Sequence, residues 1–388
     1  MLRPGSPLFS LLLLSGIFSL NFFSRIFFAP LLPELEQNLG LSHGQAGLFF
    51  FIISCGYFLS LSGSGFVSAR IGHKQAIVLS MAGTGLALAL LSMVTSLSIL
   101  RLSFFLLGLS AGLYLPSAIT TISTLFEHRQ WGRAFGVHEL APNLAFLMAP
   151  LYVALLLPHM SWQQTVQILT FFVFIAAGLY GVFGCSLKEK PAPPDLSLCR
   201  KLIGRREFWL MIILFSLGIT GTLGIYSILP TFLVSEHDFS EQAANLLVGT
   251  SRLPTLATAL AGGFLADRFG NRRTITLVLL CTGAATILLG QGQELLKFYV
   301  FLQPVIAVCF FPAAFALLSH IGPVETRSVI ISFTVPLSFV LGGGVIPAFI
   351  TGMADKDQFA AAILLTGGLI AGGSLLVQLI PEEPPQNK

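Results

Sequence analysis

Long apolar segments recur along almost the whole chain, and they leave little choice of fold. A helix that crosses a bilayer needs about 20 apolar residues, because the hydrocarbon core is about 30 Å thick and a helix rises about 1.5 Å per residue. Segments of that length lie near 8–32, 44–68, 75–95, 97–125, 134–157, 162–185, 207–234, 242–266, 274–292, 297–320, 327–352 and 358–380. Only 10% of the 388 residues are charged, against about 25% in a soluble domain. The sequence therefore predicts an all-α membrane protein of twelve transmembrane helices.

A proline-rich and charged stretch, KEKPAPPDLSLCRKLIGRRE (188–207), separates the first six of these segments from the last six. It is the longest polar stretch in the chain. We therefore expect two six-helix bundles, residues 1–187 and residues 207–380. A cytoplasmic linker over 188–206 joins them, and a short cytoplasmic tail over 381–388 follows the second bundle.

The two halves resemble each other in sequence, which indicates an internal repeat. Three pairs of residues coincide at an offset of 198 positions: Gly65 with Gly263, Arg70 with Arg268, and Gly72 with Gly270. At the same offset LSHGQAG (41–47) aligns with FSEQAAN (239–245), and YLPSA (114–118) resembles FFPAA (310–314) at an offset of 196. Repeated halves of this kind are typical of secondary transporters.

The basic residues lie almost entirely on one side of the twelve-span arrangement. Of the 21 lysines and arginines, three fall within the predicted spans, Lys297 and Lys356 fall on the outer side, and sixteen fall on the inner side. The outer segments carry acids such as Glu34, Glu36 and Glu241 instead. Because cytoplasmic segments carry an excess of Lys and Arg, we expect both termini in the cytoplasm of a multi-pass plasma-membrane protein, or of an inner-membrane protein in a bacterium. The net charge of +4 is then no evidence for a nucleic-acid partner.

The stretch GGFLADRFGNRR (262–273) places one acid and three arginines between two apolar segments. It resembles the signature loop of the major facilitator superfamily, G-x-L-x-D-R-x-G-R-R, which there joins the eighth and ninth helices. The chain supplies Gly263, Leu265, Asp267, Arg268, Gly270, Arg272 and Arg273, with Asn271 at the first basic place of the pattern. This resemblance implies the superfamily fold, in which two pseudo-symmetric six-helix bundles carry a solute by alternating access. It also implies that Asp267 latches the two halves on the inner side by meeting the positive end of a helix.

A degenerate copy of the same stretch, SGFVSARIGHKQ (64–75), stands between the second and third spans. Three of its positions keep the pattern: Gly65, Arg70 and Gly72. Ala69 replaces the acid and His73 replaces a permanent cation, so we expect a weaker latch in this half. In both copies glycine suits a tight turn, because it takes conformations that other residues resist, and we expect Gly263 to admit a neighbouring helix. The alternative is that both loops only anchor the topology.

Four charges fall unambiguously inside predicted spans, away from their ends: Arg25, Arg101, Glu139 and Arg252. A charge at mid-membrane costs at least about 2.5–3.5 kcal/mol, so it normally faces a cavity or a partner. Arg252 is the strongest candidate for substrate binding, because Pro254 should bend its helix and a guanidinium fork matches a planar anion. Carriers of oxalate and of monocarboxylates in the superfamily have an arginine on this helix, which implies anion binding here. The alternative is a structural arginine paired with a carbonyl or an acid.

Arg25 is the second candidate for substrate binding. It lies on the first helix, which lines the central cavity in the superfamily, and Asn21 is one turn away on the same face. The alternative, that Arg25 extends to the outer interface, stays open, and Arg101 is expected to do so. Four further residues are expected to offer hydrogen bonds in the cavity: Tyr57, Tyr226, Asn143 and Gln303.

Glu139 is the one acid inside a predicted span, and His138 stands beside it. Burial disfavours the charged form of a carboxylate, and histidine titrates near neutrality, so this pair predicts proton coupling. The alternative is a salt bridge from Glu139 to an inner-loop arginine such as Arg133.

These observations favour a secondary active transporter that moves a small solute. A small organic anion such as a carboxylate is the favoured substrate, because the spans hold three arginines against one acid. Efflux of amphiphilic drugs or neutral metabolites is the alternative, and a non-transporting membrane sensor is a further one. The sequence has no G-x4-G-K-[ST], no motif of an intramembrane enzyme, and five cysteines without metal or redox spacing. We therefore expect no enzyme activity, no cofactor and no metal, in a monomer whose partners are the solute, membrane lipid and, where coupling holds, protons.

Overall fold

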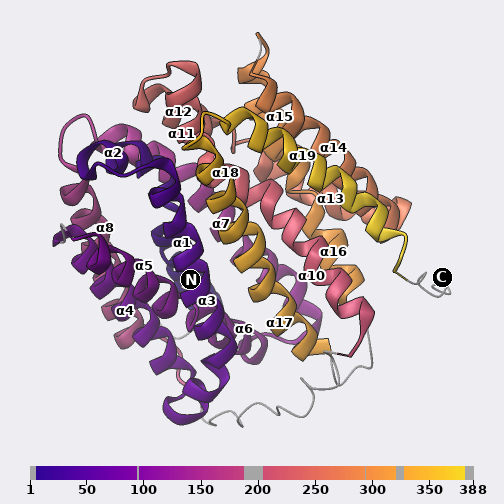
Figure 1. Cartoon of the computed structure of the whole chain (residues 1–388). Helices are drawn as coiled ribbons and strands as arrows, with labels where there is room; N and C mark the ends of the chain where they lie inside the picture. Colours follow the sequence, from indigo (N-terminus) through magenta and orange to yellow (C-terminus); the bar gives the residue numbers. More distant parts are fainter. Residues whose placement is uncertain (1–5, 94–95, 188–203, 293, 320–326, 381–388) are drawn as a thin grey trace. The chain divides into compact units, whose positions relative to one another are not determined.

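The computed structural model describes residues 6–93, 96–187, 204–292, 294–319 and 327–380. Regular structure in these residues is helical, and they contain no strand (Figure 1). Eleven candidate spans are long and apolar enough to cross a membrane. The predicted all-α membrane fold is thus confirmed. The predicted linker, 188–206, lies mostly outside the described residues, and the predicted tail, 381–388, lies wholly outside them.

The chain forms two compact units. Unit 1 comprises Met1–Leu41, Phe49–Pro194 and Phe239–Gly249, whereas unit 2 comprises Ser42–Leu48, Asp195–Asp238 and Thr250–Lys388. The two short segments in this division, Ser42–Leu48 and Phe239–Gly249, overlap LSHGQAG and FSEQAAN. These are the stretches that the internal repeat aligns, so repeat-equivalent segments play equivalent parts in the two units.

Unit 1 consists of the N-terminal helices and one helix from the second half of the sequence. Its helices are α1 (Pro7–Ile26), α2 (Phe28–Leu39), α3 (His43–Ile71) from Phe49 onward, α4 (His73–Met93), α5 (Leu97–Ala111), α6 (Tyr114–Leu125), α7 (Trp131–Leu156), α8 (Trp162–Phe183) and α12 (Glu241–Thr250). The first predicted span continues seven residues beyond its expected end at residue 32, until Gly40 ends α2 with a φ of 62°. Glu34 and Glu36, which the sequence placed in an outer loop, therefore lie on a helix.

Unit 2 contains the remaining helices, two of which are interrupted by π-helical segments. Its elements are α10 (Arg206–Ile219), η2 (Thr220–Gly224), α11 (Ile225–His237), α13 (Thr255–Phe269), α14 (Asn271–Gln291), α15 (Leu296–Ala307), α16 (Phe310–Ser319), α17 (Arg327–Val340), η4 (Leu341–Val345), α18 (Ile346–Ala354) and α19 (Phe359–Val377). The π-helical segments η2 and η4 pack closely because glycine has no side chain. A Cβ at Gly224 would lie only 2.7 Å from the carbonyl oxygen of Gly342. Such π-bulges are frequent at functional sites.

The eighth predicted span is a broken helix. Helix α12 ends at Thr250, residues 251–254 form a turn, and α13 begins at Thr255. The two pieces have 10 and 15 residues, which is why this span is absent from the eleven candidates. The prediction that Pro254 bends this helix is confirmed, because proline cannot donate the next helical hydrogen bond. Arg252 lies within the break.

The two signature stretches form turns of one residue each. Gly72 joins α3 to α4 with a φ of 84°, and Gly270 joins α13 to α14 with a φ of 83°. A residue with a Cβ rarely adopts this conformation, so the predicted role of glycine in the turn is confirmed at both positions. The expected close approach of a helix occurs one residue earlier than Gly263. A Cβ at Gly262 would lie 2.8 Å from the Cα atom of Cys309, whereas one at Gly263 would make only ordinary contact.

The N-terminal end of α12 lies beside three side chains of α2, Glu34, Glu36 and Gln37. Gln37 Nε2 lies 3.5 Å from Glu241 Oε1, and burial together with the charges of Glu34 and Glu36 raises the pKa of Glu241 from 4.5 to about 7. Glu241 begins α12 just outside the predicted span 242–266. Its carboxyl group therefore holds a proton in the folded protein at a pH where the unfolded chain has lost it.

The free energy of unfolding is expected to fall as the pH rises from 4.5 to 7, because the folded state binds more protons than the unfolded state in that window. Glu241→Gln keeps the side chain neutral and should remove this part of the slope. Melting curves across the window measure the effect, with Glu294→Gln as the control that should keep the slope. A slope that survives Glu241→Gln contradicts the prediction.

Candidate functional site

Arg25 is buried inside unit 1 rather than extended to an interface. Only 7% of its surface is exposed. Its guanidinium carbon lies 4.1 Å from the ring centroid of Tyr57 on α3 and 5.0 Å from that of Phe22 on α1. A guanidinium over an aromatic face is attracted by the ring quadrupole. The question that the sequence left open is therefore answered in favour of the interior.

Arg25 has no carboxylate partner among the described residues: no Asp or Glu of that part of the chain forms an ion pair with it. Its Nε atom is buried without a hydrogen-bond partner there. Burying a charge without a carboxylate costs stability. Among the described residues, the Arg25 guanidinium is thus held by aromatic rings and not by an acid.

Arg252, in unit 2, is also buried beside a tyrosine ring. Only 4% of its surface is exposed, and its guanidinium carbon lies 4.9 Å from the ring centroid of Tyr226 on α11. The break between α12 and α13 positions it, and Thr255 Oγ1 donates to the Arg252 carbonyl oxygen at 2.6 Å, which supports the turn. Each unit thus holds one buried arginine against the face of one buried tyrosine.

The helix that carries the arginine in one half of the sequence corresponds to the helix that carries the tyrosine in the other half. In unit 1 the arginine is on α1, the first helix of its half, and Tyr57 is on α3, its second. In the second half Tyr226 is on α11, within the first span, and Arg252 follows α12, in the second span. The same pair of helices supplies a cation and an aromatic ring in both halves, with the roles reversed.

Two other predicted cavity residues serve helix packing. Asn21 Nδ2 lies 3.4 Å from Ser80 Oγ and 3.2 Å from the carbonyl oxygen of Ala111, which ties α1 to α4 and α5. Gln303 Nε2 donates to the carbonyl oxygen of Gly221, within η2, at 2.7 Å. The side chains of Asn21 and Gln303 are both buried. Their amide donors are therefore used within their own units.

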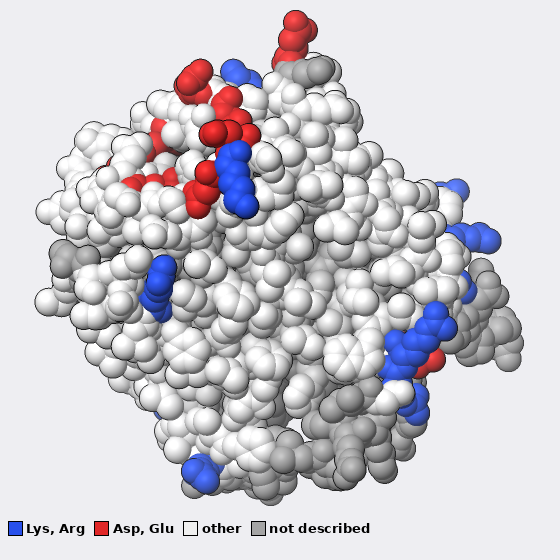
Figure 2. Space-filling model, in the orientation of Figure 1, with Lys and Arg blue, Asp and Glu red and all other residues white. Residues whose placement is uncertain are grey.

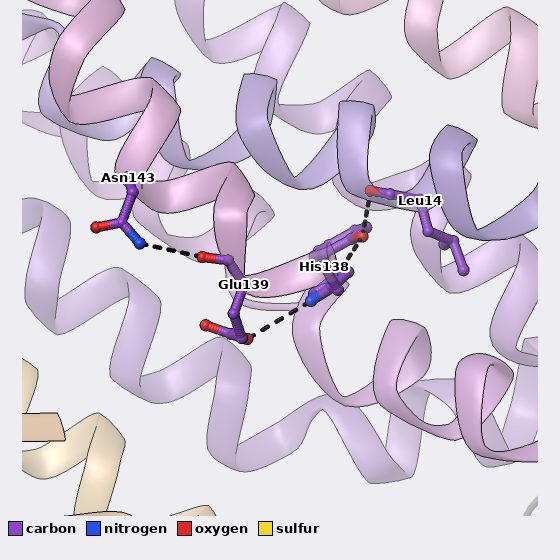
Figure 3. A network of polar contacts seen from close by, with 5 residues as sticks. Leu14, His138, Glu139 and Asn143 are labelled. Atoms are coloured by element: carbon purple, nitrogen blue, oxygen red, sulfur yellow. Dashed lines mark hydrogen bonds and ion pairs between the residues drawn. The ribbon is translucent and has the colours of Figure 1, made fainter. Parts of the chain in front are cut away.

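The proton-coupling candidates lie side by side on α7, with different exposures. His138 is fully buried, whereas 62% of the Glu139 side chain is exposed. Their nearest atoms, His138 Nδ1 and Glu139 Oε1, are 3.5 Å apart (Figure 3). Asn143, one turn on, donates from Nδ2 to the backbone carbonyl oxygen of Glu139 at 3.2 Å.

Glu139 and the exposed apolar side chains of α7 lie on different sides of that helix. Exposed apolar side chains follow one stripe of α7: Val137, Leu140, Leu144 and Met148. Glu139 and Asn143 form a second stripe, on the order of 100° around the helix axis, because each residue turns an α-helix by about that angle. The Glu139 carboxylate is thus exposed on a different side of α7 from these apolar side chains. Figure 2 shows how small a part of the visible surface carries charge.

The signature residues lie at helix ends. Asp267 and Arg268 occupy the last turn of α13, and Arg272 and Arg273 the first turn of α14, as Arg70 occupies the last turn of α3. Arg272 Nη2 donates to the carbonyl oxygen of Gln378 at 3.1 Å, which links α14 to the end of α19. In the other copy Ser68 Oγ donates to the carbonyl oxygen of Gly65 at 3.2 Å. Asp267 is exposed where the dipole of its own helix disfavours an acid, and its latch role stays a prediction.

Sequence reasoning missed Tyr114, the first residue of α6. Its hydroxyl contacts both His138 and the backbone of α1. A signal was present, since Tyr114 opens YLPSA where the repeat copy FFPAA has Phe310. A hydroxyl added to one copy of a repeated aromatic position indicates a polar partner in that half only.

Comparisons with known proteins agree with this architecture. The sequence profile described as Major Facilitator Superfamily matches residues 14–250 and 208–388. The chain is 22% identical over 366 residues to the multidrug resistance protein MdtL of Klebsiella pneumoniae, covering 92% of this chain and 91% of MdtL. It is 23% identical over 275 residues to the probable nitrate transporter NarT of Staphylococcus epidermidis, covering 70% of each.

A solved bacterial homologue of the human lysosomal transporter Spinster has a similar fold. The TM-score is 0.80 at 15% identity, and the match covers 96% of each chain. With the repeated halves and both signature turns, these matches show that the chain belongs to the major facilitator superfamily of membrane transporters.

Proposed function

We propose that this transporter carries a small organic anion, such as a carboxylate, by alternating access across the plasma membrane and together with protons. Arg252 and Arg25 are the anion-binding groups in this proposal, with Tyr226 and Tyr57 as their aromatic supports. Glu139 and His138 are the proton-binding groups. The observation that carries it is the pair of deeply buried arginines, one in each unit, each against a tyrosine face.

The choice of an anion follows from the charges that the spans contain. A buried guanidinium is expensive to keep, and a carboxylate repays that cost through two parallel N–H···O bonds. The tyrosine faces hold each guanidinium by cation–π attraction without neutralising it. An acid in place of the tyrosine would pair with the arginine and compete with a substrate.

The printed names of the relatives support two different substrate classes. NarT is named a nitrate transporter, and nitrate is a planar oxyanion like a carboxylate. MdtL is named a multidrug resistance protein, which supports the alternative of amphiphilic efflux. The experiment should therefore offer carboxylates, nitrate and neutral compounds to the same protein.

The test is uptake into liposomes that contain the purified protein, with labelled formate, acetate, oxalate, nitrate and neutral amides. Arg252→Lys keeps the charge but removes the fork, and we expect it to reduce carboxylate uptake about tenfold to hundredfold. That range follows because a hydrogen bond between charged groups contributes about 1.5–3 kcal/mol and about 1.4 kcal/mol is tenfold.

Arg101→Lys, at the remaining arginine inside a predicted span, is the matched control and should transport normally. Equal uptake of neutral amides, or no effect of Arg252→Lys, would count against an anion substrate. Preferred export of lipophilic cations or neutral dyes would favour the efflux alternative.

A further inference from the structure

We propose that His138 and Glu139 form a single binding site for one proton, and that Tyr114 is the positioning residue that fixes its geometry. The role of this site in transport rests on the proposed function. The geometry itself does not, because it follows from three contacts within unit 1. Figure 3 shows His138 between Leu14, a residue of α1, and Glu139.

The proton of the Tyr114 hydroxyl has one possible position. Tyr114 Oη lies 2.6 Å from the carbonyl oxygen of Leu14, and a carbonyl oxygen can only accept. Tyr114 therefore donates to Leu14 and can only accept from His138 Nε2, which is 3.0 Å away. This requires a proton on Nε2 in both the neutral and the charged imidazole.

The other ring nitrogen faces the carboxyl group. His138 Nδ1 has no hydrogen-bond partner among the described residues, and Glu139 Oε1 lies 3.5 Å from it. If both atoms were unprotonated, a lone pair would face a carboxylate oxygen, which is repulsive. One proton, on Nδ1 or on the carboxyl group, turns this repulsion into a hydrogen bond. A second proton would leave an imidazolium beside a neutral carboxyl group, so the contact would lose the negative charge that strengthens it.

The ring cannot easily turn to exchange its nitrogens. Phe18 on α1 stacks on it with ring centroids 4.4 Å apart and an interplanar angle of 10°, and Tyr114 lies parallel within 8° with centroids 6.0 Å apart. Aromatic stacking and the buried hydrogen bond both favour one orientation. Nδ1 therefore stays toward Glu139, whose carboxyl group is exposed and can exchange the proton with water.

The titratable groups around the pair come from four other helices. They are Tyr114 on α6, Tyr57 on α3, Arg25 on α1 against Tyr57, and Tyr180 on α8 near Tyr114. Tyr57 lies against Arg25, and it is close enough to Glu139 for the charge of the carboxylate to act there. Uptake of one proton changes the charge of the pair from −1 to zero. The field at Arg25 becomes more positive, so proton binding and anion binding should favour each other.

The tautomer of His138 tests the role of Tyr114 directly and needs no substrate. Nitrogen-15 spectra of histidine-labelled protein in lipid nanodiscs distinguish protonated from bare ring nitrogens, and His138→Gln identifies the signal among the seven histidines. We expect neutral His138 to carry its proton on Nε2 in the unaltered protein. In Tyr114→Phe the acceptor is gone, and we expect the balance to move about fivefold or more toward the Nδ1 form, the size of one hydrogen bond.

Tyr180→Phe is the matched control, because it removes another buried tyrosine hydroxyl of the same unit and should leave the tautomer unchanged. A neutral His138 protonated on Nδ1 in the unaltered protein would overturn the proposal. So would a Tyr114→Phe variant with the original tautomer, or an equal change in Tyr180→Phe.

The claim of one shared proton has its own measurement. The signals of the Glu139 side-chain carboxyl carbon and of the His138 ring nitrogens should change together as the pH is varied, because a shared proton belongs to the pair and not to either residue. Signals of the two residues that change in separate pH ranges would contradict a shared site. Because neither measurement involves transport, failure of the anion hypothesis in liposomes leaves these results intact, and failure here leaves the anion site untouched.

Discussion

Replacing Arg25 with methionine is expected to reduce anion transport at least about a hundredfold while raising the melting temperature of the protein. Methionine fills a similar volume without a charge, and it removes an Nε atom that is buried without a hydrogen bond among the described residues. Breaking a buried ion pair usually leaves an orphan charge and costs stability. Here the partner is the neutral face of Tyr57, so no orphan charge is left.

The size of both effects can be estimated. Losing a bidentate charged contact should reduce transport at least about a hundredfold, from about 3 kcal/mol of lost binding. Each kcal/mol gained in stability raises the melting temperature by about 2–4 °C in a domain of this size. Uptake assays and melting curves on the same preparation give both values.

Whether Arg25→Met raises or lowers the melting temperature distinguishes a binding role of Arg25 from a packing role. A residue kept for binding at the expense of stability gives activity loss with stabilisation. A residue kept for packing gives activity loss with destabilisation, which would remove Arg25 from the binding site. Arg101→Met is the control for the general effect of removing an arginine from a span, and it should leave transport unchanged.

The fold was predictable because it depends on hydrophobicity and charge patterns that extend over many residues. The apolar segments and the one-sided basic residues fix the spans without any knowledge of packing. The two turns at Gly72 and Gly270 were predictable from a local requirement for positive φ. The extension of the first span to Leu39 was not, because Glu34 and Glu36 look like loop residues until Gly40 is seen to end the helix.

The site was predictable only where a residue type alone carries the argument. Arg25, Arg252 and Glu139 stand out as charges within apolar segments. Their partners depend on which helix faces which, and sequence gives no access to that. Tyr114 illustrates the limit, since it lies 24 positions from His138 and 100 from Leu14 in the chain, and only the fold brings the three together.

Substituting Gly108 with alanine is expected to destabilise unit 1 and weaken anion binding together. A Cβ at Gly108 would overlap the carbonyl oxygen of Ile53 and lie 2.9 Å from the backbone nitrogen of Tyr57. These are backbone atoms of α3, so the helices must separate, and overpacking of this kind costs about 1–3 kcal/mol.

The same separation would move Tyr57 relative to Arg25, which connects packing to the binding site. Gly178→Ala, on α8 with nothing within 4 Å of an added Cβ, is the matched control. It should be neutral or stabilising, because alanine favours helix over glycine by about 0.8–1.0 kcal/mol. Melting curves and anion titrations on both variants decide the matter. If Gly108→Ala melts like Gly178→Ala, α3 and α5 are not in backbone contact, and the position of Tyr57 must be set by something other than these glycines.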